Sequence, residues 1–217
     1  MIKKNDFVEI EFTGYVNNQI FDTTNIKDSE KMGLKIKDLK PLCISVGNQM
    51  LVEGFDEDIN GKEIGKEYII EIKPEKAFGK RSHSMIKTYS INNFQKQNVS
   101  PYPGMTLQLD NLIARVISVN GGRVMIDFNN PLAGRKITYK YKIKKLITDE
   151  KDKINSLQDF FFKKRFDFDI KDKKVVFKDQ EIKNLLEIMS TKFKDITGLD
   201  FMMDIKIAES IVKDGNL

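Results

Sequence analysis

Apolar and polar residues alternate in several short stretches of the chain, a pattern typical of half-buried β-strands. In residues 7–12, Val8, Ile10 and Phe12 fall on one face and polar residues fall between them. The same alternation recurs at 19–22, 42–46, 68–72 and 137–143. We therefore expect these stretches to form the sheet of a first folded body, with the last of them closing it.

One segment of this body has helical spacing instead. Within residues 48–59, Leu51, Phe55 and Ile59 recur at every fourth position, which predicts a short amphipathic helix that Gly61 ends. Residues 27–40 are polar and irregular, and we expect a loop there.

The composition changes between His83 and Asn130, where charged residues become sparse. Alternation at 105–109, a β-branched run at 113–119 and a strand pattern at 124–128 indicate a small β unit. Gly121-Gly122 is a hairpin signal between two of these strands.

A charged stretch at 148–153 is the best linker candidate, and a third unit of mixed α and β character is expected beyond it. There Ser156 with Asp159 predicts a helix start before three consecutive phenylalanines, and Asp179 predicts a second helix cap. The remaining patterns are strands at 166–170, 175–177 and 201–207 and apolar helical positions at Ile182, Leu185, Leu186 and Met189.

Composition then excludes several classes of protein. The 217-residue chain has one cysteine, Cys43, and one histidine, His83, so it can form neither an internal disulfide nor a cysteine-based zinc site. No apolar run approaches the roughly 20 residues of a membrane span. The chain starts directly in a strand pattern with no signal-peptide core, so we expect a cytoplasmic protein without a membrane partner.

The net charge of +5 comes from 37 basic and 32 acidic residues. The basic residues are mostly lysines spread among acidic ones, and no reader motif accompanies them. We therefore expect no nucleic-acid partner. No phosphate loop, nucleophile elbow or cofactor fingerprint is present either.

A set of ordered motifs is more specific than composition. The chain carries Phe12-Thr13-Gly14, Phe21-Asp22-Thr23-Thr24, Val46-Gly47 leading to Leu51-Val52-Glu53-Gly54-Phe55, Ala77-Phe78-Gly79, and Asn130-Pro131-Leu132-Ala133-Gly134 before Ile137-Thr138-Tyr139. Over residues 5–148 this order resembles the FKBP-type peptidyl-prolyl cis-trans isomerases. The long insertion resembles the SlyD-like branch, and the further C-terminal unit resembles long-chain archaeal members.

The resemblance implies an α+β fold in which an antiparallel half-barrel sheet wraps a short helix. An isomerase domain would comprise residues 1–82 and 131–148. An insert-in-flap chaperone domain of β structure would comprise 83–130, and a C-terminal α+β domain 149–217.

The resemblance also implies a site between sheet and helix. An aromatic pocket would be lined by Phe12, Phe21, Leu42, Leu51, Val52, Phe55, Phe78 and Tyr139, with Asp22 as its charged neighbour. The backbone N–H of Val52 would donate to the carbonyl of the bound proline. Any one of these apolar residues alone would be read as plain core.

Three of these positions depart from the commonest family pattern. Phe55 stands where tryptophan is frequent, Phe78 where tyrosine is frequent, and Tyr139 where phenylalanine is common. The second change removes a hydroxyl donor to substrate, worth about 0.5–1.5 kcal/mol.

The function implied is isomerisation of X–Pro bonds during protein folding, which needs no metal or cofactor. The expected partners are unfolded or nascent polypeptides. Met85, Met105 and Met125 offer adaptable contacts for such chains, although they could equally form the core of the insert. The alternative function is a non-catalytic holdase chaperone.

The C-terminal unit is rich in adjacent apolar residues. Phe160, Phe161 and Phe162 are consecutive, and no regular helix or strand buries three neighbours on one face. We expect a homodimer through residues 149–217, and packing against residues 1–148 in a monomer is nearly as well supported.

Overall fold

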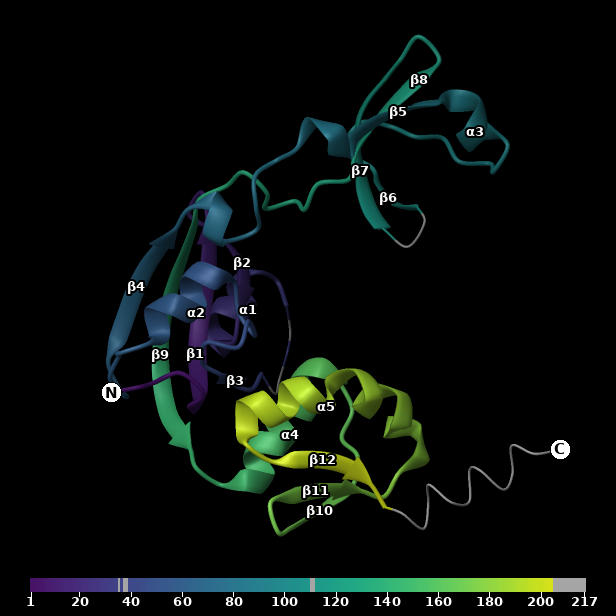
Figure 1. The fold of residues 1–217 in the computed structure, drawn as a ribbon. Coiled ribbons are helices and arrows are strands. Elements are labelled where there is room, and N and C mark those ends of the chain that lie inside the picture. The colour runs from purple at the N-terminus through teal and green to yellow at the C-terminus, as the bar shows by residue number, and fades with distance from the viewer. Residues whose placement is uncertain (35, 37–38, 110–111, 205–217) are drawn as a thin grey trace, which may run out of the picture. The chain divides into compact units, whose positions relative to one another are not determined.

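The structure is a computed structural model that describes residues 1–34, 36, 39–109 and 112–204 (Figure 1). The chain divides into two compact units. The first comprises residues 1–71 and 138–217, and the second comprises residues 72–137.

The first unit contains a five-stranded sheet in which β1 (Phe7–Val16) pairs with three other strands. The other strands of the sheet are β2 (Gln19–Thr23), β3 (Leu42–Ser45), β4 (Glu67–Ile72) and β9 (Ile137–Ile147). The order is β2-β1-β9-β4, and β3 also pairs with β1. β1 is antiparallel to all three of its partners, so the predicted antiparallel strands are confirmed.

Two short helices accompany this sheet. α1 (Ile26–Lys31) covers the start of the loop expected at 27–40, so that expectation was wrong for residues 27–31. The helix begins at Asn25, whose side chain accepts hydrogen bonds from the N–H groups of Lys27 and Asp28. Such capping stabilises a helix that has no apolar periodicity.

The predicted amphipathic helix exists but is shorter than its pattern. α2 (Glu53–Ile59) lies against one face of the sheet (Figure 1). Phe55 and Ile59 of this helix are buried. The segment before it is a turn because the Asp56 carboxylate accepts hydrogen bonds from the N–H of Gly47 at 2.7 Å and of Gln49 at 2.9 Å.

The second unit is mainly an antiparallel sheet of four strands in the order β5-β8-β7-β6. Its elements are η1 (Pro74–Lys76), η2 (His83–Met85), β5 (Ile86–Ser90), α3 (Ile91–Gln95), β6 (Thr106–Leu109), β7 (Leu112–Asn120) and β8 (Arg123–Asp127). Gly121 and Gly122 join β7 to β8 with φ of 56° and 74°, as the hairpin signal predicted.

The sheet of the second unit has one core face. That core consists of Phe94 from α3 with Ala114, Val116, Val124 and Ile126, and Met105 packs against it. Met85 and Met125 are exposed instead. The methionines of this unit therefore divide between core and surface.

The four-stranded sheet joins the rest of its unit through a narrow neck. Ser82 N–H donates to Asn129 Oδ1 at 2.8 Å, and Asn129 Nδ2 donates to Ser82 O at 2.9 Å. The entering and leaving chains are thus held together at this pair.

The C-terminal part of the chain forms a small α+β layer within the first unit. Its elements are α4 (Glu150–Phe161), β10 (Phe168–Lys171), β11 (Lys174–Phe177), η3 (Gln180–Ile182), α5 (Lys183–Thr197) and β12 (Asp200–Met203). β10 and β11 are antiparallel, and β11 and β12 are parallel. The predicted strand positions Ile205 and Ile207 lie outside the described residues.

The expected linker at 148–153 was wrong, as was the helix start at Ser156. α4 begins at Asp149, whose carboxylate accepts from the Asp152 N–H at 3.0 Å. Ser156 is buried in the middle of this helix, where its hydroxyl donates to Asp152 O. The charged run is therefore the capped first turn of a helix.

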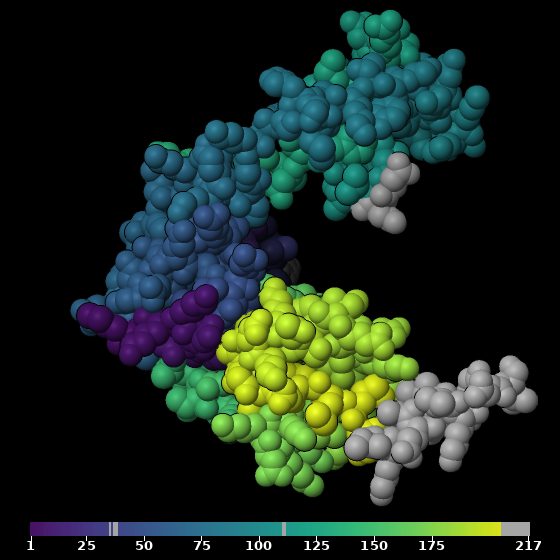
Figure 2. All heavy atoms as spheres, in the orientation of Figure 1, coloured from purple at the N-terminus to yellow at the C-terminus, as the bar shows by residue number. Residues whose placement is uncertain are grey.

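This C-terminal layer packs on the N-terminal sheet of the same unit. α4 contacts β3, Lys153 Nζ lies 5.9 Å from the centre of the Phe7 ring, and Asn5 Nδ2 donates to Asp195 O at 3.5 Å. Figure 2 shows the N-terminal residues (purple) touching the α5 segment (yellow).

The consecutive phenylalanines also find partners inside the chain. The rings of Phe161 and Phe162 each lie 5.5 Å from the ring of Phe193, and Phe160 packs on Phe161 at 4.9 Å. These ring contacts lie within residues 149–217 themselves, so they do not decide between the homodimer and packing against residues 1–148. The homodimer stays a prediction.

Candidate functional site

Four aromatic residues that the sequence analysis assigned to one site form one cluster between α2 and the sheet. The rings of Phe55 and Tyr139 stack at 4.5 Å, and Phe12 lies edge-on to both at 5.9 and 5.7 Å. Phe21 lies edge-on to Tyr139 at 5.8 Å. Phe12, Phe55 and Tyr139 are buried, whereas Phe21 is half-buried. Phe21 therefore forms the solvent-facing side of the cluster.

The cluster extends to two tyrosines that the sequence analysis did not assign. The ring of Tyr141 lies 4.8 Å from Phe55 and 5.4 Å from Tyr68. Tyr141 Oη donates to Asp58 Oδ2 at 2.5 Å, which ties β9 to α2. The alternation of Tyr139 and Tyr141 on one face of their strand was the signal that could have identified Tyr141.

A glycine makes room for the cluster. Gly14 pairs with Asp22 on β2 and with Tyr139 on β9. A Cβ atom built on Gly14 would lie 2.7 Å from Phe21 Cζ and 2.8 Å from Tyr139 Cε1. Only glycine lets both rings lie over the backbone of β1 at this point.

Hydroxyl groups fix β2 and α1 beside β1. Thr13 Oγ1 donates to Asp28 Oδ2 at 2.7 Å and also lies 2.9 Å from Thr23 Oγ1. The Phe12 N–H donates to Thr24 Oγ1 at 2.8 Å. These bonds hold the strand that carries the half-buried phenylalanine.

The charged neighbour of the cluster is Asp22, an exposed residue next to Phe21. Desolvation of its carboxylate by the surrounding protein raises its pKa, and a hydrogen bond from the Thr23 N–H partly opposes this. Burial also raises the pKa of Tyr139, and the charge of Asp22 adds to the effect. The site thus places a carboxylate beside a neutral phenol.

The start of α2 completes this side of the cluster. Val52 is the N-cap residue, with φ −61° and ψ 144°, and both Leu51 and Val52 are half-buried. The Val52 carbonyl accepts from the N–H groups of Phe55 and Asp56. Among the described residues no hydrogen bond engages the Val52 N–H.

Two further predicted site residues lie on other segments of the chain. Leu42 is on β3 and pairs with Ile10 on β1. Phe78 follows η1 in the second unit and is half-buried there.

Comparison with protein-family models gives two matches. The model of the FKBP-type peptidyl-prolyl cis-trans isomerases matches residues 1–95. A model described as "FKBP26, IF domain" matches residues 89–132. In the described part of the chain, no helix is both long and apolar enough to span a membrane.

Similar proteins come from archaea and bacteria. A short-type peptidyl-prolyl cis-trans isomerase of Methanocaldococcus jannaschii is 30% identical over 146 residues, which cover 66% of this chain and 93% of that protein. The SlyD isomerase of Aeromonas hydrophila is 27% identical over 107 residues, 48% of this chain and 50% of that protein. A 16 kDa FKBP-type isomerase of Escherichia coli is 24% identical over 146 residues, 65% of this chain and 91% of that protein. The chain therefore belongs to the FKBP-type peptidyl-prolyl cis-trans isomerases, and it is an enzyme that interconverts the cis and trans forms of X–Pro bonds.

Proposed function

We propose that this isomerase accelerates the folding of polypeptides whose X–Pro bonds are slow to isomerise, and that its aromatic cluster holds the proline. Rotation about an X–Pro bond is slow because amide resonance stabilises the planar form, with a barrier of about 20 kcal/mol. Aromatic walls that exclude water favour the less dipolar twisted form.

The positions of individual residues support this assignment. Phe12, Phe55 and Tyr139 supply a buried apolar floor, whereas Phe21 and Asp22 are accessible to a bound chain. The Val52 N–H is available to donate to the carbonyl of the bound proline. The chemistry then needs neither a nucleophile nor a metal, because no covalent bond is made or broken.

The second unit is proposed to bind the unfolded chain itself. One face of its sheet covers the core, but large apolar side chains remain exposed elsewhere on the same unit: Met85, Tyr102, Leu112, Ile113, Ile117 and Met125. Exposed apolar surface of this kind marks interaction sites. This observation carries the chaperone part of the proposal.

Binding and catalysis on one chain reinforce each other. A client segment held by the second unit raises the effective concentration of its prolines near the aromatic cluster. The chain has one cysteine, so it cannot form an internal disulfide and would not be stabilised by an oxidising compartment. This supports the cytoplasm as the setting.

The test measures two activities of the full chain. One is refolding of a protein whose folding rate is limited by X–Pro isomerisation, and the other is isomerisation of a proline tetrapeptide. Changing Ile113 and Ile117 together to serine should reduce refolding activity at least about fivefold more than tetrapeptide activity. Ile69→Ser is the matched control, because Ile69 on β4 is as exposed as Ile113, at 69%. Equal losses on both substrates would refute binding by the second unit.

A further inference from the structure

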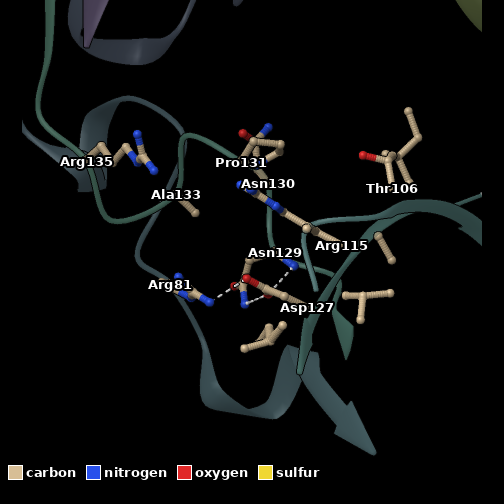
Figure 3. Close-up of a pocket in the computed structure, with 14 residues that line it drawn as sticks. Arg81, Thr106, Arg115, Asp127, Asn129, Asn130, Pro131, Ala133 and Arg135 are labelled. Atoms are coloured by element: carbon tan, nitrogen blue, oxygen red, sulfur yellow. Dashed lines mark hydrogen bonds and ion pairs between the residues drawn. The ribbon is translucent and has the colours of Figure 1, made fainter. Parts of the chain in front are cut away.

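A cavity of about 590 Å³ opens on the face of the four-stranded sheet that is turned away from its core (Figure 3). Along β7, Ala114 and Val116 belong to the core. The alternate residues Ile113, Arg115 and Ile117 are exposed on the other face and line the cavity. The segment 129–135 supplies much of the opposite wall.

The cavity has an apolar side. Ile113 is 69% exposed and Ile117 is 38% exposed, and Pro131, from the segment that follows β8, lines the same cavity. No aromatic side chain lines the cavity among the described residues. An apolar strip without stacking rings fits aliphatic side chains better than nucleobases.

The cavity is also basic. Three arginines line it, Arg81, Arg115 and Arg135, together with one carboxylate, Asp127. Figure 3 shows Arg81 joined to Asp127, and Arg115 and Arg135 at other points of the wall. The Arg81–Asp127 ion pair is 2.6 Å long.

The Asp127 carboxylate has further partners besides Arg81. It also accepts from Asn129, from the N–H at 2.9 Å and from Nδ2 at 2.6 Å. Burial opposes its ionisation, but the hydrogen bonds from Asn129 and the charge of Arg81 outweigh it and lower its pKa. Asp127 therefore neutralises Arg81 at neutral pH.

Within the described residues, Arg115 and Arg135 have no counter-charge. Both are exposed, and in the described part of the chain neither forms an ion pair. Two guanidinium groups beside an apolar strip are complementary to a carboxylate that neighbours an aliphatic side chain.

We propose that this cavity selects client segments in which aspartate or glutamate lies next to aliphatic residues. The apolar side chains would pack on Ile113 and Ile117 while the carboxylate pairs with Arg115 or Arg135. The inference rests on the proposed binding of unfolded chains by the second unit, and it adds a charge preference to that binding.

The test uses the full chain and three short fluorescein-labelled peptides with the same aliphatic residues. They differ only in carrying Glu, Gln or Lys at two flanking positions. Binding is measured by fluorescence anisotropy. The Glu peptide should bind about three- to tenfold more tightly than the Lys peptide at low salt. This ratio should shrink between about 0.05 and 0.3 M NaCl as the charges are screened.

The double variant Arg115→Gln, Arg135→Gln should remove most of that preference, and Arg115→Lys, Arg135→Lys should retain part of it. Arg123→Gln is the matched control, because Arg123 is an exposed arginine of the same sheet that does not line the cavity. Circular dichroism of each variant checks the fold, and the salt series on the unaltered chain needs no variant.

The outcomes separate the two proposals. Equal affinity for the Glu and Lys peptides, together with binding of an unfolded protein, would overturn the charge preference alone. An equal effect of Arg123→Gln would also overturn the assignment to this cavity. Failure of the full chain to bind any peptide or unfolded protein would overturn both proposals.

Discussion

The ring of Phe21 lies directly over Gly14, so that a Cβ atom at position 14 would stand 2.7 Å from Phe21 Cζ. Real Cβ atoms do not approach a ring carbon this closely, and the Tyr139 ring blocks the other direction at 2.8 Å. The solvent-facing side of the aromatic cluster therefore depends on the missing side chain of Gly14.

Gly14→Ala should displace one or both rings. We expect a loss of stability of about 1–3 kcal/mol, typical of overpacking, together with lower tetrapeptide activity. Urea denaturation and a peptide assay measure the two effects. Adding Phe21→Leu to Gly14→Ala should restore part of the stability, and simple additivity of the two changes would contradict the contact.

Phe21→Ala should slow isomerisation of a short proline peptide about five- to tenfold, because it removes the accessible wall of the proposed proline site. Asp22→Ala should also slow it several-fold. Lys140→Ala is a control for changes at the surface, because Lys140 is an exposed residue that follows Tyr139 in the sequence. Unchanged turnover in both variants with an intact fold would refute the site.

Although loss of the Asp22 carboxylate should lower activity, it should raise the stability of the fold at neutral pH. Desolvation raises the pKa of Asp22 in the folded state above 3.8, so the folded state is penalised when the carboxylate is ionised at neutral pH. The penalty fades as the pH falls through the raised pKa and is absent below the unfolded value. Asp22→Asn should therefore raise the melting temperature at pH 7 and leave it nearly unchanged near pH 3. A lower melting temperature at pH 7 would contradict this.

Asp56 should be essential to the turn before α2. Its carboxylate accepts two backbone hydrogen bonds and is buried, so Asp56→Ala leaves both the Gly47 and Gln49 N–H groups without their partner. We expect a cost of about 1–3 kcal/mol in urea denaturation. Glu57→Ala, an exposed neighbour on the same helix, is the matched control.

Much of the aromatic cluster was predictable because its residues lie in regular patterns. Phe12, Phe55 and Tyr139 each fall on the apolar face of a strand or helix. The resemblance to the family motifs then predicted that they belong to one cluster. Tyr141 was missed as a site residue, although it lies on the same face of its strand as Tyr139. The role of Gly14 was not predictable, because it depends on two rings from other strands that meet over its backbone.

The errors in the fold have a common cause. The loop expected at 27–40 overlaps α1, and the linker expected at 148–153 overlaps the first turn of α4; these helices are capped by Asn25 and Asp149. Polar, charged turns carry no periodic signal, and the caps that stabilise them also occur in loops. α4 also packs on β3, a contact between distant parts of the chain that no local pattern in the sequence indicates.

Replacing residues 83–128 by a short glycine-containing loop should separate the two proposed activities. The Ser82–Asn129 hydrogen bonds hold the two chain ends together, so a short loop can close the gap. Refolding activity on an unfolded protein should fall at least about tenfold, with a much smaller change on a tetrapeptide. A parallel loss on both substrates would mean that the replaced residues support the aromatic cluster.

The proposed homodimer through residues 149–217 is tested by light scattering on the full chain. A mass of twice 25.1 kDa at tens of micromolar (about the range in which weak dimers form) supports it. Phe160→Ser, at the half-buried end of α4, should then weaken the association. A monomer at that concentration would show that packing within the chain is sufficient.

The Ser82–Asn129 neck has a consequence for how such an enzyme can diversify. An insertion whose two ends are hydrogen-bonded neighbours can be exchanged by recombination without altering the path of the chain on either side. If the second unit binds clients as proposed, its exposed surface can accumulate substitutions under selection for new clients, while Gly14, Phe55 and Tyr139 stay under selection for the packing of the aromatic cluster. Client range and catalytic rate would thus evolve on separate parts of one gene.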